Sequence, residues 1–156
     1  MVVCNNPSAK VLDIANENGI PSLLITKERF FKGDGYLPEL RAKQVGLIVL
    51  AGFLWKIPQT LLGAYPGQII NIHPALLPKY GGKGMYGLRV HETVILYKEK
   101  ESGITIHYVD EKYDNGDIIF QATCPVLEDD TAASLAKRVG GLEHRYFAEV
   151  IEKILS

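Results

Sequence analysis

The chain has 156 residues, of which 47% are hydrophobic and 22% are charged, and its formal net charge at pH 7 is −1. These values fit one compact domain over residues 1–156 and exclude a disordered chain. The net charge near zero argues against a broad polyanion-binding surface, and no apolar run reaches membrane-spanning length. We therefore expect no nucleic-acid and no membrane partner. Because no export signal opens the chain, we also expect a cytoplasmic protein.

The two cysteines, Cys4 and Cys124, stand far apart in apolar stretches. This spacing matches neither a disulfide framework nor a zinc clip. We predict two free, buried thiols in a reducing compartment.

The first half of the chain alternates between short apolar runs and helical patterns. Asn6 can cap a helix that has Pro7 at its first position, and Gly19 suits the end of that helix. The run Leu47–Phe53 is apolar throughout, as in a central parallel strand covered on both faces. Further strands are expected in segments 1–6, 21–26 and 68–72, and further helices in segments 32–46 and 57–65. The alternation predicts an α/β fold with a mostly parallel sheet flanked by helices.

The second half begins with a glycine-rich loop that leads into a helix within residues 81–100. Segment 102–110 alternates apolar and polar residues, which predicts a strand with two different faces, and segment 118–126 is its partner. Asp129 or Asp130 is expected to cap a long amphipathic helix. The apolar stripe of this helix comprises Leu135, Val139, Leu142, Phe147, Val150, Ile151 and Leu155.

The chain begins inside its first predicted strand. An open α/β sheet usually carries a glycine-rich phosphate loop after its first strand, where a helix N-terminus meets the ligand. No such loop stands at the start of this sequence. Either the fold does without the loop or a preceding βα unit is missing, and we expect an N-terminally incomplete domain.

A histidine and an asparagine stand at the end of a buried strand, in the stretch NIHPALLPKY over residues 71–80. Strand alternation puts Asn71 and His73 on the same side, so both can face one crevice at the carboxyl end of the sheet. Pro74 removes a backbone donor and fixes the path of the chain after the strand. The structural alternative is a strand-end histidine that binds a backbone carbonyl, but the neighbouring asparagine favours function.

Asp114, in the stretch YDNGD, is the acid that best completes this set, because the following Asn-Gly pair favours a tight turn. A histidine–carboxylate pair would favour the charged imidazole and give a general acid, and Asn71 would donate to an oxyanion. The alternative is that Asp114 and its neighbours are solvated turn residues, and we prefer that interpretation for Asp117.

The remaining histidines have less certain roles. His107 shares a strand face with Thr105, so it either supports the site or is structural. His91 and His144 fall in helical stretches, and we favour a structural role for His91. No H-x-x-x-H or C-x-x-C spacing supports a metal site, so we expect none. Spacing alone indicates acyl or carbonyl chemistry, with several reaction classes open.

Four motifs carry a family resemblance: LAGFLWKIP, NIHPALLPKYGG, GITIHYVDEKYDNGDIIFQ and LEHRYFAEVI, in this order. Together they resemble the phosphoribosylglycinamide formyltransferases, a folate-dependent family of purine synthesis, over almost the whole chain. The resemblance implies a Rossmann-like formyltransferase fold. It also implies transfer of a formyl group from 10-formyltetrahydrofolate to the glycine amine of glycinamide ribonucleotide, without a metal.

The resemblance also implies roles for individual residues. Asn71, His73 and Asp114 become the catalytic set, in which Asn71 and protonated His73 stabilise the oxyanion while Asp114 holds His73 charged and helps to relay the proton. Predicted folate-binding residues are Leu50, Leu54, Trp55, Ile57, Leu62, Ile69, Val109, Asp110 and Glu111. Predicted contacts to the ribonucleotide substrate are Gly52, Phe53, Ile72, Pro74 and Glu143.

The sequence departs from the family in four places. The family's first strand, substrate-phosphate loop and first helix have no counterpart here, so we expect full activity to need them. Gly140 stands where some relatives carry a polar contact, and Trp55-Lys56 replaces an arginine-containing pair. Segment 81–92 is longer and richer in glycine than in some relatives, and we expect a mobile loop near the nucleotide.

Three other functions stay open at this point: methionyl-tRNA formyltransferase, formyltetrahydrofolate hydrolase, and a non-catalytic folate-binding polypeptide. The first adds a C-terminal domain and usually a basic tRNA surface, and the second an N-terminal regulatory domain. We expect neither addition in this protein, because the sequence ends with its long helix and its net charge is near zero. The protein is expected to be a monomer or a homodimer.

Overall fold

The computed structural model describes residues 1–156, which divide into two compact units. The first unit comprises residues 1–46 and 57–65, and the second comprises residues 47–56 and 66–156. The expectation of one domain over the whole chain stays a prediction. None of the helices combines the length and the apolar content that a membrane crossing requires.

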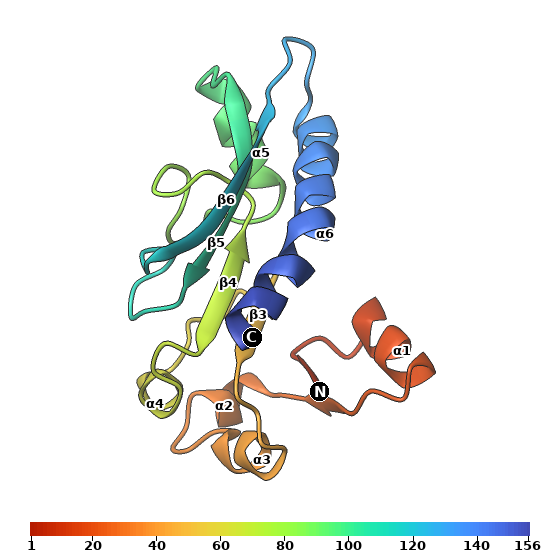
Figure 1. The fold of residues 1–156 in the computed structure, drawn as a ribbon, viewed down its shortest axis with the longest axis vertical. Helices are drawn as coiled ribbons and strands as arrows, with labels where there is room; N and C mark the ends of the chain where they lie inside the picture. The colour runs from red at the N-terminus through yellow and green to blue at the C-terminus, as the bar shows by residue number, and fades with distance from the viewer. The chain divides into compact units, whose positions relative to one another are not determined.

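The first unit contains a parallel pair of short strands, β1 (Val2–Cys4) and β2 (Ser22–Leu24), joined through helix α1 (Lys10–Glu17). This is the βαβ connection that the alternating pattern predicts. The unit also holds α2 (Lys27–Phe30), α3 (Leu37–Ala42) and α4 (Gln59–Ala64). Figure 1 labels the four helices of this unit. Helix α2 has no counterpart among the predicted elements.

Helix α1 starts later than predicted. The side-chain oxygen of Asn6 accepts a hydrogen bond from the amide of Ser8 at 3.0 Å, which makes a local turn instead of a helix cap. Ala9 occupies the cap position, so the prediction of Asn6 as cap and Pro7 as first helical residue is wrong. Gly19 follows the helix with φ +64°, as predicted for its end.

The second unit contains a four-stranded sheet in the order β3 (Ile48–Ala51), β4 (Ile69–His73), β5 (Glu101–Tyr108) and β6 (Ile118–Pro125). Strands β3 and β4 run parallel, whereas β4–β5 and β5–β6 are antiparallel. All four strands were predicted, and the α/β class is confirmed. The sheet itself is mixed, and its two antiparallel pairings both involve β5.

Strand β3 lies at an edge of this sheet, and its Val49 side chain is 37% exposed. The prediction of a central strand covered on both faces is therefore wrong for β3. An apolar run shows that a strand tolerates burial, but it does not fix how many neighbours the strand has.

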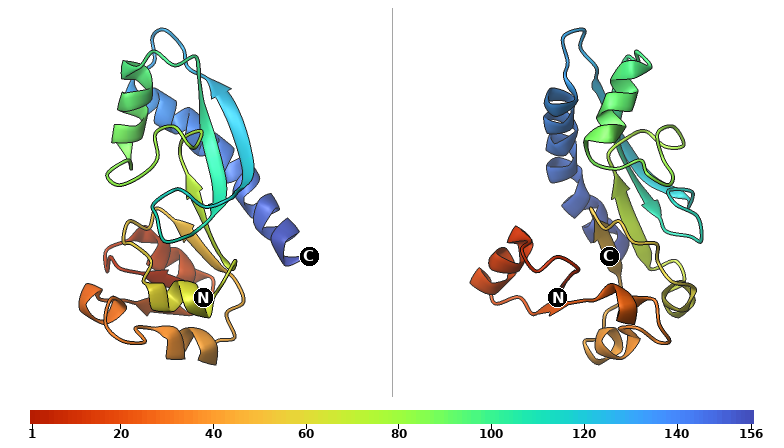
Figure 2. Two further views of the ribbon diagram at one scale, coloured as in Figure 1. Left: turned by 90° about the vertical axis from the view of Figure 1, so that its left-hand side faces the viewer. Right: turned by 180° about the vertical axis from the view of Figure 1, so that it is seen from behind.

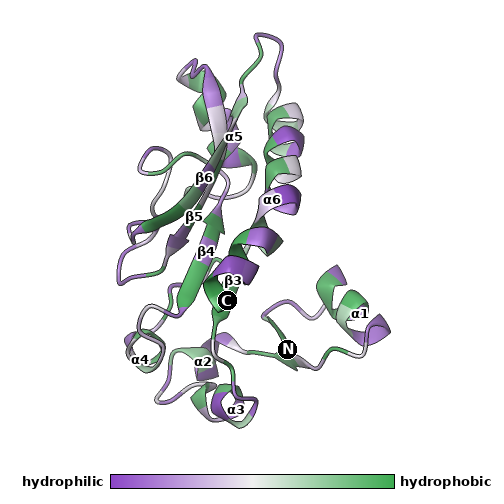
Figure 3. Cartoon of the chain, viewed as in Figure 1, coloured by the Kyte–Doolittle hydropathy of each residue, from purple (hydrophilic) through white to green (hydrophobic).

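Two helices complete the second unit, α5 (Leu88–Leu96) and α6 (Ala132–Leu155). Helix α6 packs against β5, β6 and α5 (Figure 1), and the turned views in Figure 2 show the same arrangement. Hydrophobic and hydrophilic residues alternate along α6 (Figure 3), as its amphipathic pattern predicts. Within the predicted stripe, Leu135, Val139 and Val150 are buried, whereas Leu155 is 66% exposed near the C-terminus.

The N-terminus of α6 differs from the prediction. Thr131 is the cap: its hydroxyl accepts from the amide of Ser134, and the hydroxyl of Ser134 accepts in return from the amide of Thr131. Asp130 instead forms a bidentate ion pair with Arg138, at 2.5 and 2.9 Å. The prediction of Asp129 or Asp130 as cap is therefore wrong by one residue.

The core of the second unit lies between the sheet and α6. Buried isoleucines on β4 and β5 face Leu135 and Val139 of the helix, and each such side chain contributes about 1.5–3 kcal/mol through burial. Cys124 is buried in this core, and both thiols are free, as predicted. Cys4, in the first unit, is half-buried, so the prediction of a buried thiol is wrong there. Both strands are part of this packed core, and their polar residues belong to the candidate site.

Candidate active site

The carboxyl end of β4 opens onto a cleft of about 850 Å³ that lies entirely within the second unit. The cleft is bounded by residues 51–54 after β3, residues 71–74 of β4, the glycine-rich loop 82–87, residues 113–114, and residues 143–151 of α6. This is where ligands of open α/β sheets bind. Asn71, His73 and Asp114 all line it, so the structure brings the predicted catalytic set together.

His73 is held by contacts at both ring nitrogens, and its residue is only 4% exposed. Its Nε2–H donates to the backbone carbonyl of Tyr80 at 2.8 Å, because a carbonyl oxygen can only accept. Its Nδ1 lies 3.6 Å from Oδ2 of Asp114. The same carboxylate oxygen accepts a hydrogen bond from the amide of Gly82 at 2.9 Å.

Burial has the largest effect on the pKa of His73. It lowers the pKa of the imidazole, and the opposing effects of the Asp114 carboxylate and the Tyr80 carbonyl do not fully offset it. The Asp114 carboxylate favours the charged imidazole but does not outweigh burial, and the expectation that Asp114 holds His73 charged stays a prediction. For Asp114, burial would raise the pKa, but the contacts to His107, His73 and Gly82 outweigh it and lower the pKa, so the carboxylate is ionised at neutral pH.

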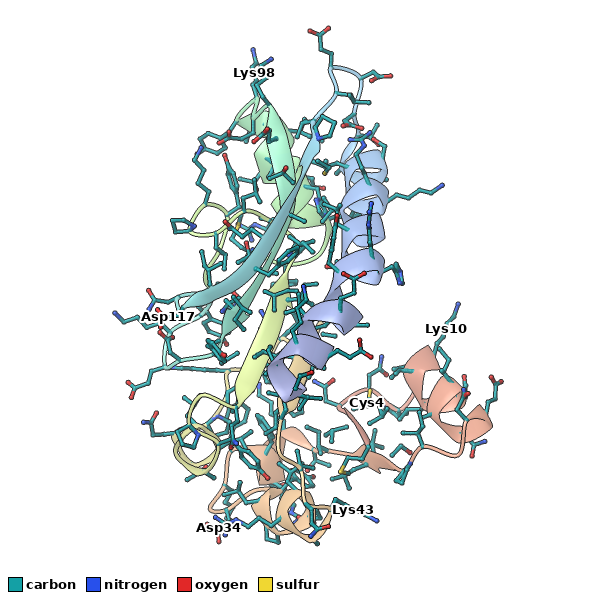
Figure 4. The ribbon with its side chains drawn as sticks, viewed as in Figure 1. Cys4, Lys10, Asp34, Lys43, Lys98 and Asp117 are labelled. Atoms are coloured by element: carbon teal, nitrogen blue, oxygen red, sulfur yellow. The ribbon has the colours of Figure 1, made fainter.

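Asp114 sits in a backbone conformation that few residues adopt, with φ +52°. Aspartate tolerates this left-handed region better than most side chains. The surrounding loop is tied by Asp110, which accepts from the amide of Lys112 and from the side chain of Asn115, each at 2.8 Å. Asp117, at the end of this loop, is exposed and points outward in Figure 4, which confirms its interpretation as a solvated turn residue.

His107, whose role the sequence left open, lies beside the catalytic set. On β5 it stands directly opposite Asn71 of β4, and the side chains of directly opposed residues lie on the same face of the sheet. Its Nε2 lies 3.1 Å from Nδ2 of Asn71 and 3.6 Å from Oδ1 of Asp114. His91 is buried on α5 with an unpaired Nδ1, and its pKa is lowered by burial and by the nearby His73.

The predicted substrate contacts all line the cleft: Gly52, Phe53, Ile72, Pro74 and Glu143. Glu143 is half-buried, and burial raises the pKa of its carboxyl group, with a smaller opposing effect from His144. His144 also lines the cleft. Sequence reasoning did not select it, because an exposed histidine on a helix carries no local signal.

The residues predicted to bind folate are spread over both units, unlike the predicted substrate contacts. Only Leu54 lines the cleft. The others in the second unit are Leu50, Trp55, Ile69, Val109, Asp110 and Glu111, whereas Ile57 and Leu62 belong to the first unit. Ile69 is 1% exposed and Ile57 is 5% exposed. The roles of these residues in folate binding stay predictions.

The glycine-rich loop supplies six lining residues that sequence reasoning did not name one by one: Gly82, Lys83, Gly84, Met85, Tyr86 and Gly87. Their glycine density was the available signal, and it led only to the prediction of a loop near the nucleotide. Lys83 is the only lysine or arginine that lines the cleft.

Known proteins resemble this chain along nearly its full length. The family model described as formyl transferase matches residues 1–151. The chloroplastic phosphoribosylglycinamide formyltransferase of Arabidopsis thaliana is 42% identical over 99% of this chain and 54% of its own length, and a second plant relative is covered to 51%. The chain thus spans about half the length of these relatives.

Shorter relatives are covered more fully. The phosphoribosylglycinamide formyltransferase of Bacillus subtilis (strain 168) is 38% identical over 99% of this chain and 79% of its own length. The crystal structure of the enzyme of that name from Bacillus halodurans aligns with a TM-score of 0.87 at 36% identity, over 99% of this chain and 79% of that one. These matches confirm the resemblance inferred from the four motifs. The chain belongs to the formyl transferase family.

Proposed function

We propose that this chain transfers a formyl group from 10-formyltetrahydrofolate to the amine of glycinamide ribonucleotide. The observation that carries the proposal is the meeting of Asn71, His73 and Asp114 at one cleft. Attack of an amine on a formyl carbon requires three groups: an amide donor, an imidazole and an ionised carboxylate. The names of the relatives from plants and Bacillus point to the same reaction.

In this proposal the substrate amine attacks the formyl carbon, and the carbonyl oxygen becomes a tetrahedral oxyanion. Asn71 donates a hydrogen bond to that oxygen. The growing negative charge raises the pKa of His73, so an imidazole that burial keeps neutral takes up a proton as the intermediate forms. That proton is the one that the attacking amine releases, relayed by Asp114, whose carboxylate then stabilises the imidazolium. When the intermediate collapses, the bond between the formyl carbon and the folate nitrogen breaks, and that nitrogen leaves with the proton.

One contact must change for His73 to reach the oxyanion directly. Its Nε2–H is bound to the carbonyl of Tyr80, one residue before the glycine-rich loop. A turn of this carbonyl away from the ring frees the N–H. Gly81 and Gly82 directly follow Tyr80 and give the backbone the freedom for such a turn.

The cleft fits a folate-derived donor. Its volume of about 850 Å³ lies in the range of small-molecule sites. Phe53, Leu54 and Phe147 offer apolar surface to an aromatic pterin, while Lys83 is the cation in the lining that an anionic group on either substrate would attract. Glu143, with its half-buried carboxylate, would accept from the ribose hydroxyls.

The experiment is an assay of formyl transfer to glycinamide ribonucleotide by the chain and by three variants. His73→Ala is expected to lower kcat by more than about a hundredfold. Asp114→Asn keeps the shape of the side chain and its tolerance of positive φ, so a comparable loss would report its charge alone. Asp117→Asn, a solvated acid of the same loop, is the matched control and should keep the wild-type rate.

A His73→Ala variant with a near wild-type rate would remove His73 from the mechanism. If the chain binds folate in a calorimetric titration but transfers no formyl group, it is a folate-binding polypeptide and not an enzyme. If it does neither, the proposal fails.

A further inference from the structure

His107 is fully enclosed, with 2% of the residue exposed, and both of its ring nitrogens face polar atoms. Nδ1 lies 2.8 Å from the backbone carbonyl of Tyr108. Nε2 lies 3.1 Å from the amide nitrogen of Asn71 and 3.6 Å from Oδ1 of Asp114. The ring therefore touches two members of the catalytic set and has no direct place in the proposed chemistry.

The carbonyl of Tyr108 fixes which nitrogen carries the proton. A carbonyl oxygen can only accept, so Nδ1 must donate to it, and the neutral ring then has a bare Nε2. A bare Nε2 is an acceptor, and the amide NH₂ of Asn71 donates to it. Rotation of the Asn71 amide by half a turn would place its oxygen against the bare nitrogen, which is repulsive. The tautomer of His107 thus sets the orientation of the Asn71 amide.

We propose that His107 is a positioning residue that locks the Asn71 amide in the orientation used for formyl transfer. One N–H of Asn71 donates to His107. The second N–H and the side-chain oxygen have no partner in the protein. Since Asn71 lines the cleft, these two groups are left for the substrates. The importance for catalysis rests on the proposed function, whereas the orientation itself does not.

The competing arrangement puts a proton on Nε2 as well, so that His107 donates to Asp114. The lowered pKa of Asp114, to which the contact with His107 contributes, is the observation in its favour. The amide of Asn71 would then have to present its oxygen to the ring and its NH₂ elsewhere. The distances favour Asn71 over Asp114 as the partner, at 3.1 Å against 3.6 Å. The two arrangements predict different ¹⁵N signals of the His107 ring and different effects of substitutions at His107.

Two substitutions separate the functions of the two nitrogens. His107→Asn keeps a donor near the position of Nδ1 for the Tyr108 carbonyl but has no group at the position of Nε2. His107→Gln reaches the position of Nε2, and its side-chain oxygen can accept from Asn71. We expect His107→Asn to lower kcat at least tenfold with KM for both substrates within twofold, and His107→Gln to keep kcat within about threefold of wild type.

A double-mutant cycle tests whether His107 acts through Asn71. In an Asn71→Ala background, His107→Asn should lower kcat less than twofold further. An equal loss in both backgrounds would overturn the proposal, because a merely structural defect does not need the Asn71 amide. Equal rates for His107→Asn and wild type would overturn it as well.

The orientation is tested without any activity by ¹⁵N spectra of the histidine side chains and the Asn71 amide. We expect a protonated Nδ1 and an unprotonated Nε2 for His107 at neutral pH, and an Asn71 NH₂ signal that shifts in His107→Asn but not in His107→Gln. A protonated Nε2 at neutral pH would overturn the proposal even if formyl transfer is confirmed. The expected spectra would uphold the orientation even in a chain that transfers nothing.

Discussion

Glu143 illustrates a conflict between stability and binding at a single residue. Its carboxyl group is half-buried, and burial raises its pKa, so the charged form is disfavoured in the folded protein. A raised pKa in the folded state means that the full contribution to stability is present below the unfolded value of 4.5 and is lost as the pH rises through the folded value. At neutral pH the protein therefore holds a carboxylate that it would be more stable without.

We predict that Glu143→Gln raises the free energy of unfolding at pH 8, with a gain that shrinks toward zero as the pH falls to 4.5. Glutamine keeps the shape and removes the buried charge. The measurement is urea unfolding of both proteins over this pH range. The same variant should raise KM for glycinamide ribonucleotide, since the proposed acceptor for the ribose hydroxyls is weakened. A gain in stability that does not depend on pH would contradict the electrostatic explanation.

Sequence reasoning brought the predicted catalytic residues together but did not predict their charge. Strand alternation was enough to put Asn71 and His73 on one face, and the turn-forming Asn-Gly pair was enough to select Asp114. The pKa of His73 depends instead on how fully the ring is covered and on the carbonyl of Tyr80, seven residues away in the chain. Burial from several directions leaves no local pattern in the sequence. The lowered pKa of His73 therefore could not be predicted from the sequence.

At the scale of single elements, the N-terminus of α6 is the clearest case for a stability measurement. Thr131 and Ser134 exchange hydrogen bonds between their hydroxyls and each other's amides, at 3.2 and 3.0 Å. We predict that Thr131→Ala lowers the free energy of unfolding by about 1 kcal/mol, because the amide of Ser134 loses its acceptor. Thr131→Ser keeps the hydroxyl and is the matched control, expected within about 0.5 kcal/mol of wild type. An equal loss in both variants would show that the methyl group matters and the cap does not.

The loop between β5 and β6 depends on a glycine for close packing. A side-chain carbon at Gly116 would overlap the carbonyl of Tyr108, the same carbonyl that binds His107. We predict that Gly116→Ala displaces the loop that carries Asp114 and lowers kcat at least tenfold, which corresponds to about 1.4 kcal/mol of lost transition-state stabilisation.

Gly141→Ala on α6 is the control for this prediction, because a side-chain carbon there meets nothing within 4 Å. Alanine at this helical position should leave kcat unchanged and raise the free energy of unfolding by up to about 1 kcal/mol. A Gly116→Ala variant that retains full activity would mean that the loop tolerates the shift, and that Asp114 is held by its own contacts alone.

Element types were predictable where several residues agreed, and boundaries were not. The pattern of α6 repeats over 24 residues, so its existence was secure. Its cap was predicted one or two residues too early, because Asp129, Asp130 and Thr131 are all good capping residues. Asp130 is instead paired with Arg138. The start of α1 failed for a related reason, since Asn6 used its side chain to close a turn.

At the scale of the whole molecule, the sequence predicted the α/β class but not the order or direction of all the strands. An apolar run such as residues 47–53 is compatible with a central or an edge position, and strand pairing is decided by partners far away in the chain. The residues predicted to bind folate stay predictions. The nine predicted contacts are distributed over both units, and only one lines the cleft.

The pH dependence of the free energy of unfolding combines the effects of His73, His91 and Glu143. Burial lowers the pKa of both His73 and His91 below the ordinary value of 6.5. A group with a lowered pKa in the folded state contributes stability that is fully present above the unfolded value and is lost as the pH falls through the folded value. We therefore predict that the free energy of unfolding falls as the pH drops below 6.5, with a slope of at most about 1.4 kcal/mol per pH unit for each histidine.

Glu143 opposes this trend just above pH 4.5, so the Glu143→Gln variant should show the steeper fall. His91→Leu removes one of the two histidines together with an unpaired buried nitrogen, and it should make the fall shallower. The measurement is urea unfolding between pH 5 and 8 for all three proteins. If His91→Leu has the same slope as wild type, the pKa of His91 is the same in the folded and unfolded states. The loss of stability at low pH would then come from His73 alone. Protonation at the cleft would therefore be the first event to destabilise the fold as the pH falls.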